Sequence, residues 1–230
     1  MCVGVEICNY CENNEATDVE HIYPKSLFPE RAFRWDNYLL SCGTCNTKYK
    51  SDGFAVFDPA NSENLVELVR EQPPLNNDGV FINPRLDNPT DFLFLDFLTF
   101  RFTARLNISL RDQRRTEYTI ALLKLNDREA LVAARRRAAN YYFDRLERYV
   151  RVRDTQTMEE LIQAVPDPHL VNQDESFNVE HERIMDALRD EIKRCVHPTV
   201  WYEMKEQRQR QERLRKLNVL LTQAPEALDW

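Results

Sequence analysis

The chain has 230 residues, of which 43% are hydrophobic and 30% charged, and its formal net charge is −7. A chain of this length buries enough surface to fold without disulfide bonds, as one compact unit or two small ones. The composition excludes a membrane-spanning protein, because no apolar run approaches the ~18–20 residues that a span requires. The first residues lack the pattern of a signal peptide, so we expect a cytoplasmic protein. The acidic balance argues against a generic nucleic-acid coat protein.

Sparse glycine and long stretches with a polar-apolar period predict a mostly helical protein. In residues 1–58, prolines, glycines and cysteine pairs interrupt the chain at short intervals, and this stretch is predicted to form an N-terminal module. Residues 59–165 should form a connecting segment followed by a basic helical region. Residues 166–230 are predicted as a C-terminal helical region.

Apolar periodicity predicts the elements that follow the N-terminal module. Residues 91–106 are apolar on nearly every side, which fits either a buried strand pair or a buried helix. A short amphipathic helix is predicted over residues 117–125. Asn126 and Glu129 resemble a capping box that starts a longer helix. Further helices are expected over residues 181–195 and 199–222, with a polar loop over 166–180 and a tail over the last eight residues.

Positive charge is concentrated in residues 101–153, which contain 14 basic and 6 acidic side chains and therefore carry a net charge of +8. This stretch, including Arg135 and Arg136, is either a solvated helix face or a surface that follows phosphates. The same two interpretations apply to Lys48 and Lys50, which follow the last cysteine pair.

Four of the six cysteines form two Cys-x-x-Cys pairs separated by 30 residues: Cys8, Cys11, Cys42 and Cys45. Such pairs can supply four thiolates at ~2.3 Å to one tetrahedral Zn²⁺. Four sulfurs leave no open coordination position, so this zinc would be structural. The alternatives are that Cys2 or Cys195 participates, or that the thiols are simply buried.

A second pattern lies between and just after the cysteine pairs. An acidic residue directly precedes a histidine, one asparagine lies in an apolar segment, and another directly follows the last cysteine; these are Glu20, His21, Asn37 and Asn46. Over about 45 residues the chain resembles the HNH nuclease family, whose site is a zinc-clamped ββα-metal fold. The resemblance therefore implies an α+β fold that is mostly helical, with an HNH endonuclease module followed by a helical domain.

The resemblance also implies a role for each of these residues. His21 would be the general base that activates water, and the side-chain carbonyl of Asn37 would hold its ring. Glu20 and Asn46 would hold one catalytic Mg²⁺ or Mn²⁺. Glu20 stands where many family members have aspartate, and Asn46 stands where others have a second histidine.

Residues 82–89 and 119–126 look like parts of the nuclease subunits (PtuB-type) of the Septu anti-phage system, which also occur beside some retrons. This resemblance implies an ABC/SMC-like ATPase partner (PtuA-type), with residues 155–230 as a candidate docking region. A non-catalytic zinc adaptor for nucleic acid or protein remains an alternative, as does a stand-alone restriction or homing enzyme. The sequence does not distinguish a DNA substrate from an RNA substrate.

Overall fold

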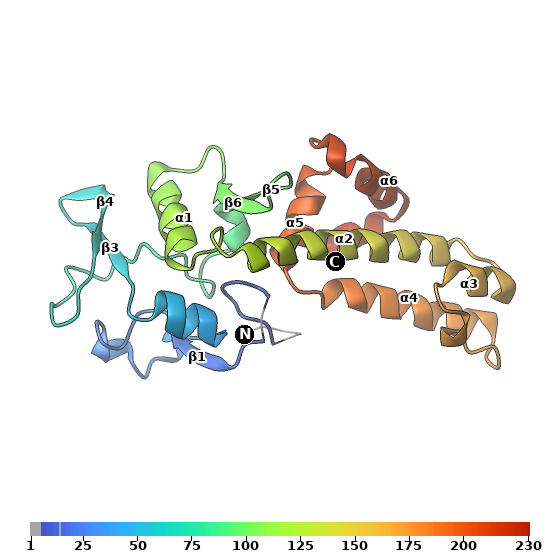
Figure 1. The fold of residues 1–230 in the computed structure, drawn as a ribbon, viewed down its shortest axis with the longest axis horizontal. Helices are drawn as coiled ribbons and strands as arrows, with labels where there is room; N and C mark the ends of the chain where they lie inside the picture. The colour runs from blue at the N-terminus through green and yellow to red at the C-terminus, as the bar shows by residue number, and fades with distance from the viewer. Residues whose placement is uncertain (1–5, 14) are drawn as a thin grey trace. The chain divides into compact units, whose positions relative to one another are not determined.

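The computed structural model describes residues 6–13 and 15–230, which form two compact units, Met1–Arg136 and Arg137–Trp230 (Figure 1). The boundaries expected at residues 58 and 165 fall inside these units. The first unit extends beyond residue 58 because the strands that follow it contact helix α1 (Leu110–Leu122). Helix α2 (Glu129–Arg153) is continuous through the boundary between the units. Within the described residues, none of the helices is long and apolar enough to cross a membrane.

The N-terminal module is a hairpin followed by a helix. Strands β1 (Asp18–His21) and β2 (Tyr38–Ser41) pair antiparallel, and the 3₁₀ turns η1 (Pro29–Arg31) and η2 (Trp35–Asn37) lie between them. The helix η3 (Thr44–Lys50) is a π-helix. Two strands and a helix were expected here. The wider π form is notable because π segments occur frequently at functional sites.

Two further hairpins complete the sheets of the first unit. They consist of β3 (Ala55–Asp58) with β4 (Asn61–Glu67) and β5 (Leu93–Asp96) with β6 (Arg101–Ala104), and the turn η4 (Pro89–Asp91) precedes β5. Residues 91–106 therefore adopt the strand-pair alternative. Leu93 and Leu95 are buried while their neighbours are half-buried, which is the period-two pattern of a strand with one face inward.

The capping of helices α1 and α2 differs from the expected pattern. Helix α1 starts earlier because the Ser109 side chain accepts a hydrogen bond from the backbone N–H of Asp112. Asn126 does not cap α2. Its amide instead accepts from the backbone N–H of Phe102 at 2.8 Å and donates to the Phe102 carbonyl at 2.7 Å. Asn126 thus connects the turn before α2 to strand β6.

The second unit is helical. After α2 it contains α3 (Met158–Ala164), η5 (Pro168–Leu170), α4 (Phe177–Lys193), α5 (Pro198–Gln207), η6 (Glu212–Leu214), α6 (Arg215–Gln223) and η7 (Pro225–Asp229). One helix was expected over residues 199–222. The structure has two α-helices there, α5 and α6, which are separated after Gln207 by a segment that contains the turn η6. The last residues are not a tail, since the Trp230 ring lies 4.7 Å from the Tyr149 ring.

Candidate functional site

The two cysteine pairs meet in one buried cluster. The sulfur atoms lie within 4.8 Å of one another and belong to Cys8, Cys11, Cys42 and Cys45. The Cys11 and Cys42 sulfurs are 3.9 Å apart, close to the ~3.8 Å edge of a tetrahedron with bonds of ~2.3 Å. The four thiols therefore fit a single tetrahedral zinc ion. Cys195 lies in the second unit, and Cys2 lies outside the described residues.

A basic side chain contacts this cluster. Nη1 of Arg128 lies 3.3 Å from the Cys45 sulfur, and its guanidinium lies over the Tyr49 ring at 5.3 Å. Four thiolates around Zn²⁺ carry a net charge of −2, and burial makes such a charge costly. Arg128 offsets part of that charge and donates a hydrogen bond to one ligand, which is how partners of metal ligands tune a site.

We expect Arg128→Leu to lower the zinc affinity about 10- to 100-fold, because an uncompensated thiolate cluster binds the metal less tightly. Competition with a chromophoric chelator measures this affinity. Arg114→Leu is the matched control, since Arg114 is an exposed arginine on α1 whose ion-pair partner is Glu117. An Arg128→Leu affinity equal to that of the control would show that the contact has no role in holding zinc.

Strand β1 presents two acidic side chains to helix η3. The Asn46 side chain donates to the Asp18 carboxylate at 3.2 Å. One turn further along η3, the Lys50 ammonium forms an ion pair with Glu20 and donates to the His21 carbonyl at 2.9 Å. Alternate residues of a strand share a face, and helix residues four apart also lie on one side. The two polar contacts therefore form a matched ladder between strand and helix.

The Glu20–Lys50 pair is almost completely buried, with 2% and 1% of the two residues exposed. Burial raises the pKa of the Glu20 carboxyl and lowers the pKa of the Lys50 amine, while the attraction between the two groups opposes both shifts. The sequence left two interpretations of Lys50, a phosphate contact or a solvated lysine. Neither holds in this structure, because the ammonium is buried inside the module and pairs with Glu20.

Lys50→Met should lower the free energy of unfolding by about 3–5 kcal/mol, because it leaves the Glu20 charge buried without a partner. Urea denaturation followed by circular dichroism measures the loss. Adding Glu20→Gln to the same chain should recover most of it. Lys48→Met, an exposed neighbour on η3, should change stability by no more than about 0.5 kcal/mol. Equal stability of Lys50→Met and Lys48→Met would contradict the role of the pair.

His21 is held by a backbone carbonyl. Its Nε2 lies 3.0 Å from the oxygen of Ala32, and the Tyr38 hydroxyl donates to the same oxygen at 2.8 Å. The rings of His21 and Tyr38 meet edge to face at 5.1 Å. When Nε2–H donates to this carbonyl, Nδ1 keeps its lone pair and can accept a proton. The group that orients the His21 ring is thus the carbonyl of Ala32. The resemblance had implied the side chain of Asn37 for this role.

Asn37 holds the backbone on either side of the site. It is 2% exposed, and its carbonyl accepts from the backbone N–H of Tyr23 at 2.7 Å. Its amide donates to the carbonyls of Tyr23 and Arg31 at 3.0 and 3.1 Å. These bonds join the segment after β1 to the turn that carries Ala32. Asn37 therefore positions His21 through the main chain.

A hollow of about 250 Å³ at the end of β1 is lined by three of the four expected site residues, and Asn37 is not among them. Its lining includes Glu20, His21 and Asn46, together with Val19, Pro24, Lys25, Thr47, Ser51 and Asp52. An imidazole and several oxygen-bearing side chains, among them Glu20 and Asn46, therefore border one small, open cavity.

Residues 8–52 match the HNH endonuclease family model. The match spans both cysteine pairs, β1, β2 and η3, and we call this segment the HNH module. It supports a nuclease function, since the HNH endonuclease family consists of hydrolases that act on nucleic acid. Comparisons with curated proteins and with solved structures gave no match.

The donor set of the HNH module fits a hard divalent cation. Glu20 and Asn46, which line the hollow, carry the carboxylate and amide oxygens that Mg²⁺ and Mn²⁺ prefer. Coordination by Glu20 would require its carboxylate to exchange the Lys50 ammonium for the metal. Asp18, on the same strand face as Glu20, is not among the residues that line the hollow; its carboxylate accepts the hydrogen bond that the Asn46 amide donates.

Many basic side chains of residues 101–153 bind carboxylates or carbonyls of the same chain. Arg135 is 1% exposed and donates to the carbonyls of Phe100 and Leu125 at 3.1 and 2.8 Å, and burial lowers its pKa to about 10. It is therefore a structural residue and not a phosphate contact. Arg136 is exposed and lies 5.2 Å from the Phe100 ring. Several other arginines form ion pairs, among them Arg101–Glu129, Arg111–Asp78, Arg115–Asp87 and Arg145–Glu191.

Proposed function

We propose that the chain is a metal-dependent endonuclease that hydrolyses phosphodiester bonds in nucleic acid. The observation that carries this proposal is the placement of His21, oriented by the Ala32 carbonyl, at a hollow that Glu20 and Asn46 also line. A fixed imidazole beside a set of hard oxygen ligands is the arrangement that metal-assisted hydrolysis requires. The match of residues 8–52 to the HNH model supports the same conclusion.

Each side chain has a defined task in this proposal. Nδ1 of His21 accepts the proton of the attacking water, and the Ala32 carbonyl stabilises the imidazolium that results. Glu20 and Asn46 supply the ligands for Mg²⁺ or Mn²⁺. When bound, this cation would neutralise charge on the scissile phosphate and on the leaving oxygen. Lys25 at the rim of the hollow and the exposed Lys48 on η3 attract the phosphate.

The direct test is cleavage by the purified zinc-loaded protein. Supercoiled plasmid, linear duplex, single-stranded DNA and total tRNA are incubated with Mg²⁺, with Mn²⁺, or without added divalent metal. We expect strand scission in at least one substrate, and only when metal is present. Absence of scission in all of them, both with and without an ATPase partner, would contradict the proposal.

The defence role rests on the resemblance of residues 82–89 and 119–126 to nuclease subunits of the Septu system. In this proposal the enzyme is a cytoplasmic effector that an ABC/SMC-like ATPase of the PtuA type restrains, with residues 155–230 as the docking region. Co-purification with the product of a neighbouring ATPase gene tests it. Deletion of residues 155–230 should abolish co-purification while the zinc stoichiometry stays at one.

One observation favours a second candidate, a non-catalytic adaptor. The Glu20 carboxylate is paired with Lys50, an arrangement that is complete without a catalytic metal. Mn²⁺ binding followed by electron paramagnetic resonance separates the candidates. The enzyme should bind one Mn²⁺ that Glu20→Gln weakens, whereas the adaptor should bind none at this site.

A further inference from the structure

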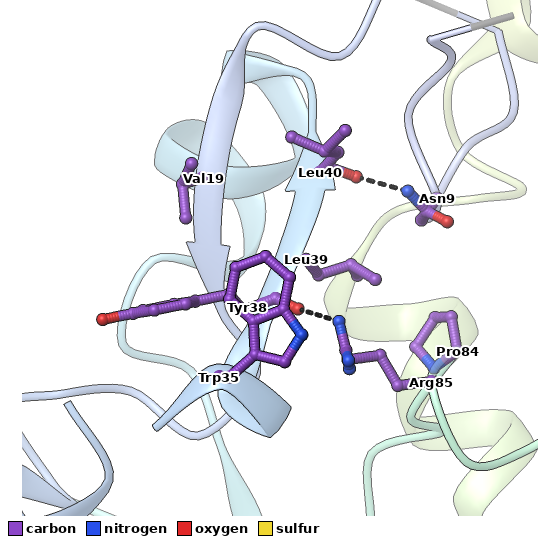
Figure 2. A pocket seen from close by; sticks show the side chains of 8 residues that line it. All are labelled: Asn9, Val19, Trp35, Tyr38, Leu39, Leu40, Pro84 and Arg85. Atoms are coloured by element: carbon purple, nitrogen blue, oxygen red, sulfur yellow. Dashed lines mark hydrogen bonds between the residues drawn. The ribbon is translucent and has the colours of Figure 1, made fainter. Parts of the chain in front are cut away.

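A second cavity lies beside the hollow at His21 and is lined in part by strands β1 and β2. This groove has a volume of about 560 Å³ and is lined by Asn9, Val19, Trp35, Tyr38, Leu39, Leu40, Pro84 and Arg85. Figure 2 shows Val19, Tyr38 and Trp35 on one side and Pro84 and Arg85 on the other. All of these residues belong to the first unit.

The lining combines flat apolar surface with one cation. Trp35 is 64% exposed and Val19 is 59% exposed, so both offer area to a ligand. Among the described residues of the lining, Arg85 is the one charged residue and none carries a carboxylate. Its guanidinium lies 5.8 Å from the Trp35 ring and donates to the Tyr38 carbonyl at 3.1 Å (Figure 2). A fixed arginine beside an open indole is suited to stacking with a planar, electron-rich ring.

The groove adjoins the hollow at His21. Val19 lines both the groove and the catalytic hollow. Tyr38 lines the groove, contacts the His21 ring and shares the Ala32 carbonyl with it. A ligand in the groove would therefore be separated from a ligand at His21 by the width of one side chain.

We propose that this groove is a nucleobase subsite, in which an unpaired base stacks on Trp35 while the adjoining phosphate lies at His21. Single-stranded or locally unpaired nucleic acid is then the substrate class. The reason is that a base in an intact duplex is stacked on both faces and reaches such a groove only after it leaves the stack. The cleavage part of this inference rests on the proposed function, whereas the binding part does not.

Trp35→Ala tests the subsite through binding alone. A fluorescein-labelled 12-nucleotide single strand and the matching blunt duplex are titrated with zinc-loaded protein in a His21→Ala background, without added divalent metal. Stacking on an aromatic side chain contributes ~1–3 kcal/mol per base, so Trp35→Ala should weaken single-strand binding about 5- to 150-fold. Duplex binding should change less than about two-fold. Trp35→Phe should restore most of the single-strand affinity.

Phe33→Ala is the matched control, because Phe33 is an aromatic residue that is 94% exposed and does not line the groove. It should leave both affinities unchanged. An equal loss for single strand and duplex in Trp35→Ala would overturn the preference for unpaired bases. No loss at all would overturn the subsite, and a simultaneous change in sedimentation coefficient would then identify the groove as a protein-docking surface.

The binding experiment also separates this inference from the proposed function. Trp35-dependent binding by a wild-type protein that cuts nothing would leave the subsite standing and remove the nuclease assignment. If the wild-type protein cleaves nucleic acid and Trp35→Ala binds the single strand as tightly as the protein with Trp35 unchanged does, the nuclease assignment stands and the subsite is removed.

Discussion

His21→Ala is expected to abolish metal-dependent strand scission while leaving zinc content and melting temperature almost unchanged. The imidazole is the group at the hollow that can accept the proton of the attacking water, and general base catalysis contributes ~10²–10⁴-fold in rate. The fold depends on it little, because the side chain is half-buried and its ring bonds one carbonyl, that of Ala32. Nicking rates of supercoiled plasmid in Mg²⁺ and in Mn²⁺ measure the loss.

The chain contains a closely matched control for this variant. His181 on α4 is also half-buried, and its Nε2 also lies 3.0 Å from a backbone carbonyl, that of Val152. His181→Ala therefore removes the same kind of contact outside the HNH module and should leave the cleavage rate unchanged. Cleavage by His21→Ala at the wild-type rate would exclude a catalytic role for this histidine.

Cys42→Ser should release zinc and unfold the HNH module. Structural zinc sites contribute ~10–16 kcal/mol of apparent binding free energy at pH 7, which is available to folding only while all four ligands are in place. Cys42 lies between β2 and η3, so its loss frees the helix that carries Asn46 and Lys50. Cleavage should be lost as a consequence. Elemental analysis gives the zinc stoichiometry, and thermal denaturation gives the loss of structure.

Cys195→Ser provides the control for the zinc site. Cys195 is a half-buried free thiol in the second unit, so its replacement should leave one zinc per chain. A Cys42→Ser protein that keeps stoichiometric zinc and its melting temperature would contradict coordination by four thiolates.

Features set by neighbours in the chain could be predicted from the sequence. The paired spacing of Cys8 with Cys11 and of Cys42 with Cys45 fixes two knuckles, and the structure confirms that their thiols meet in one buried group. The strand pair within residues 91–106 was one of two alternatives, because periodicity does not separate buried strands from buried helices.

Contacts between distant side chains could not be predicted in the same way. Lys50 looked like a solvated or phosphate-binding lysine, since nothing in its local sequence indicates that its partner is Glu20, 30 residues away. Arg135 belongs to an Arg-Arg-Arg run, yet the carbonyls of Phe100 and Leu125 bind it inside the first unit. Burial and partner choice depend on tertiary packing, which overrides composition at both positions.

The carbonyl of Ala32 has a consequence for how the HNH module tolerates change. Every amino acid carries this oxygen, so a point substitution at position 32 leaves the acceptor for His21 and Tyr38 in place. The orientation of the general base is thus robust to the identity of the residue that provides it. It is vulnerable instead to the path of the main chain, because a one-residue insertion or deletion in the loop between His21 and Asn37 would move the oxygen by ~3 Å or more. The length of this loop therefore matters more to the orientation of His21 than the identity of residue 32 does.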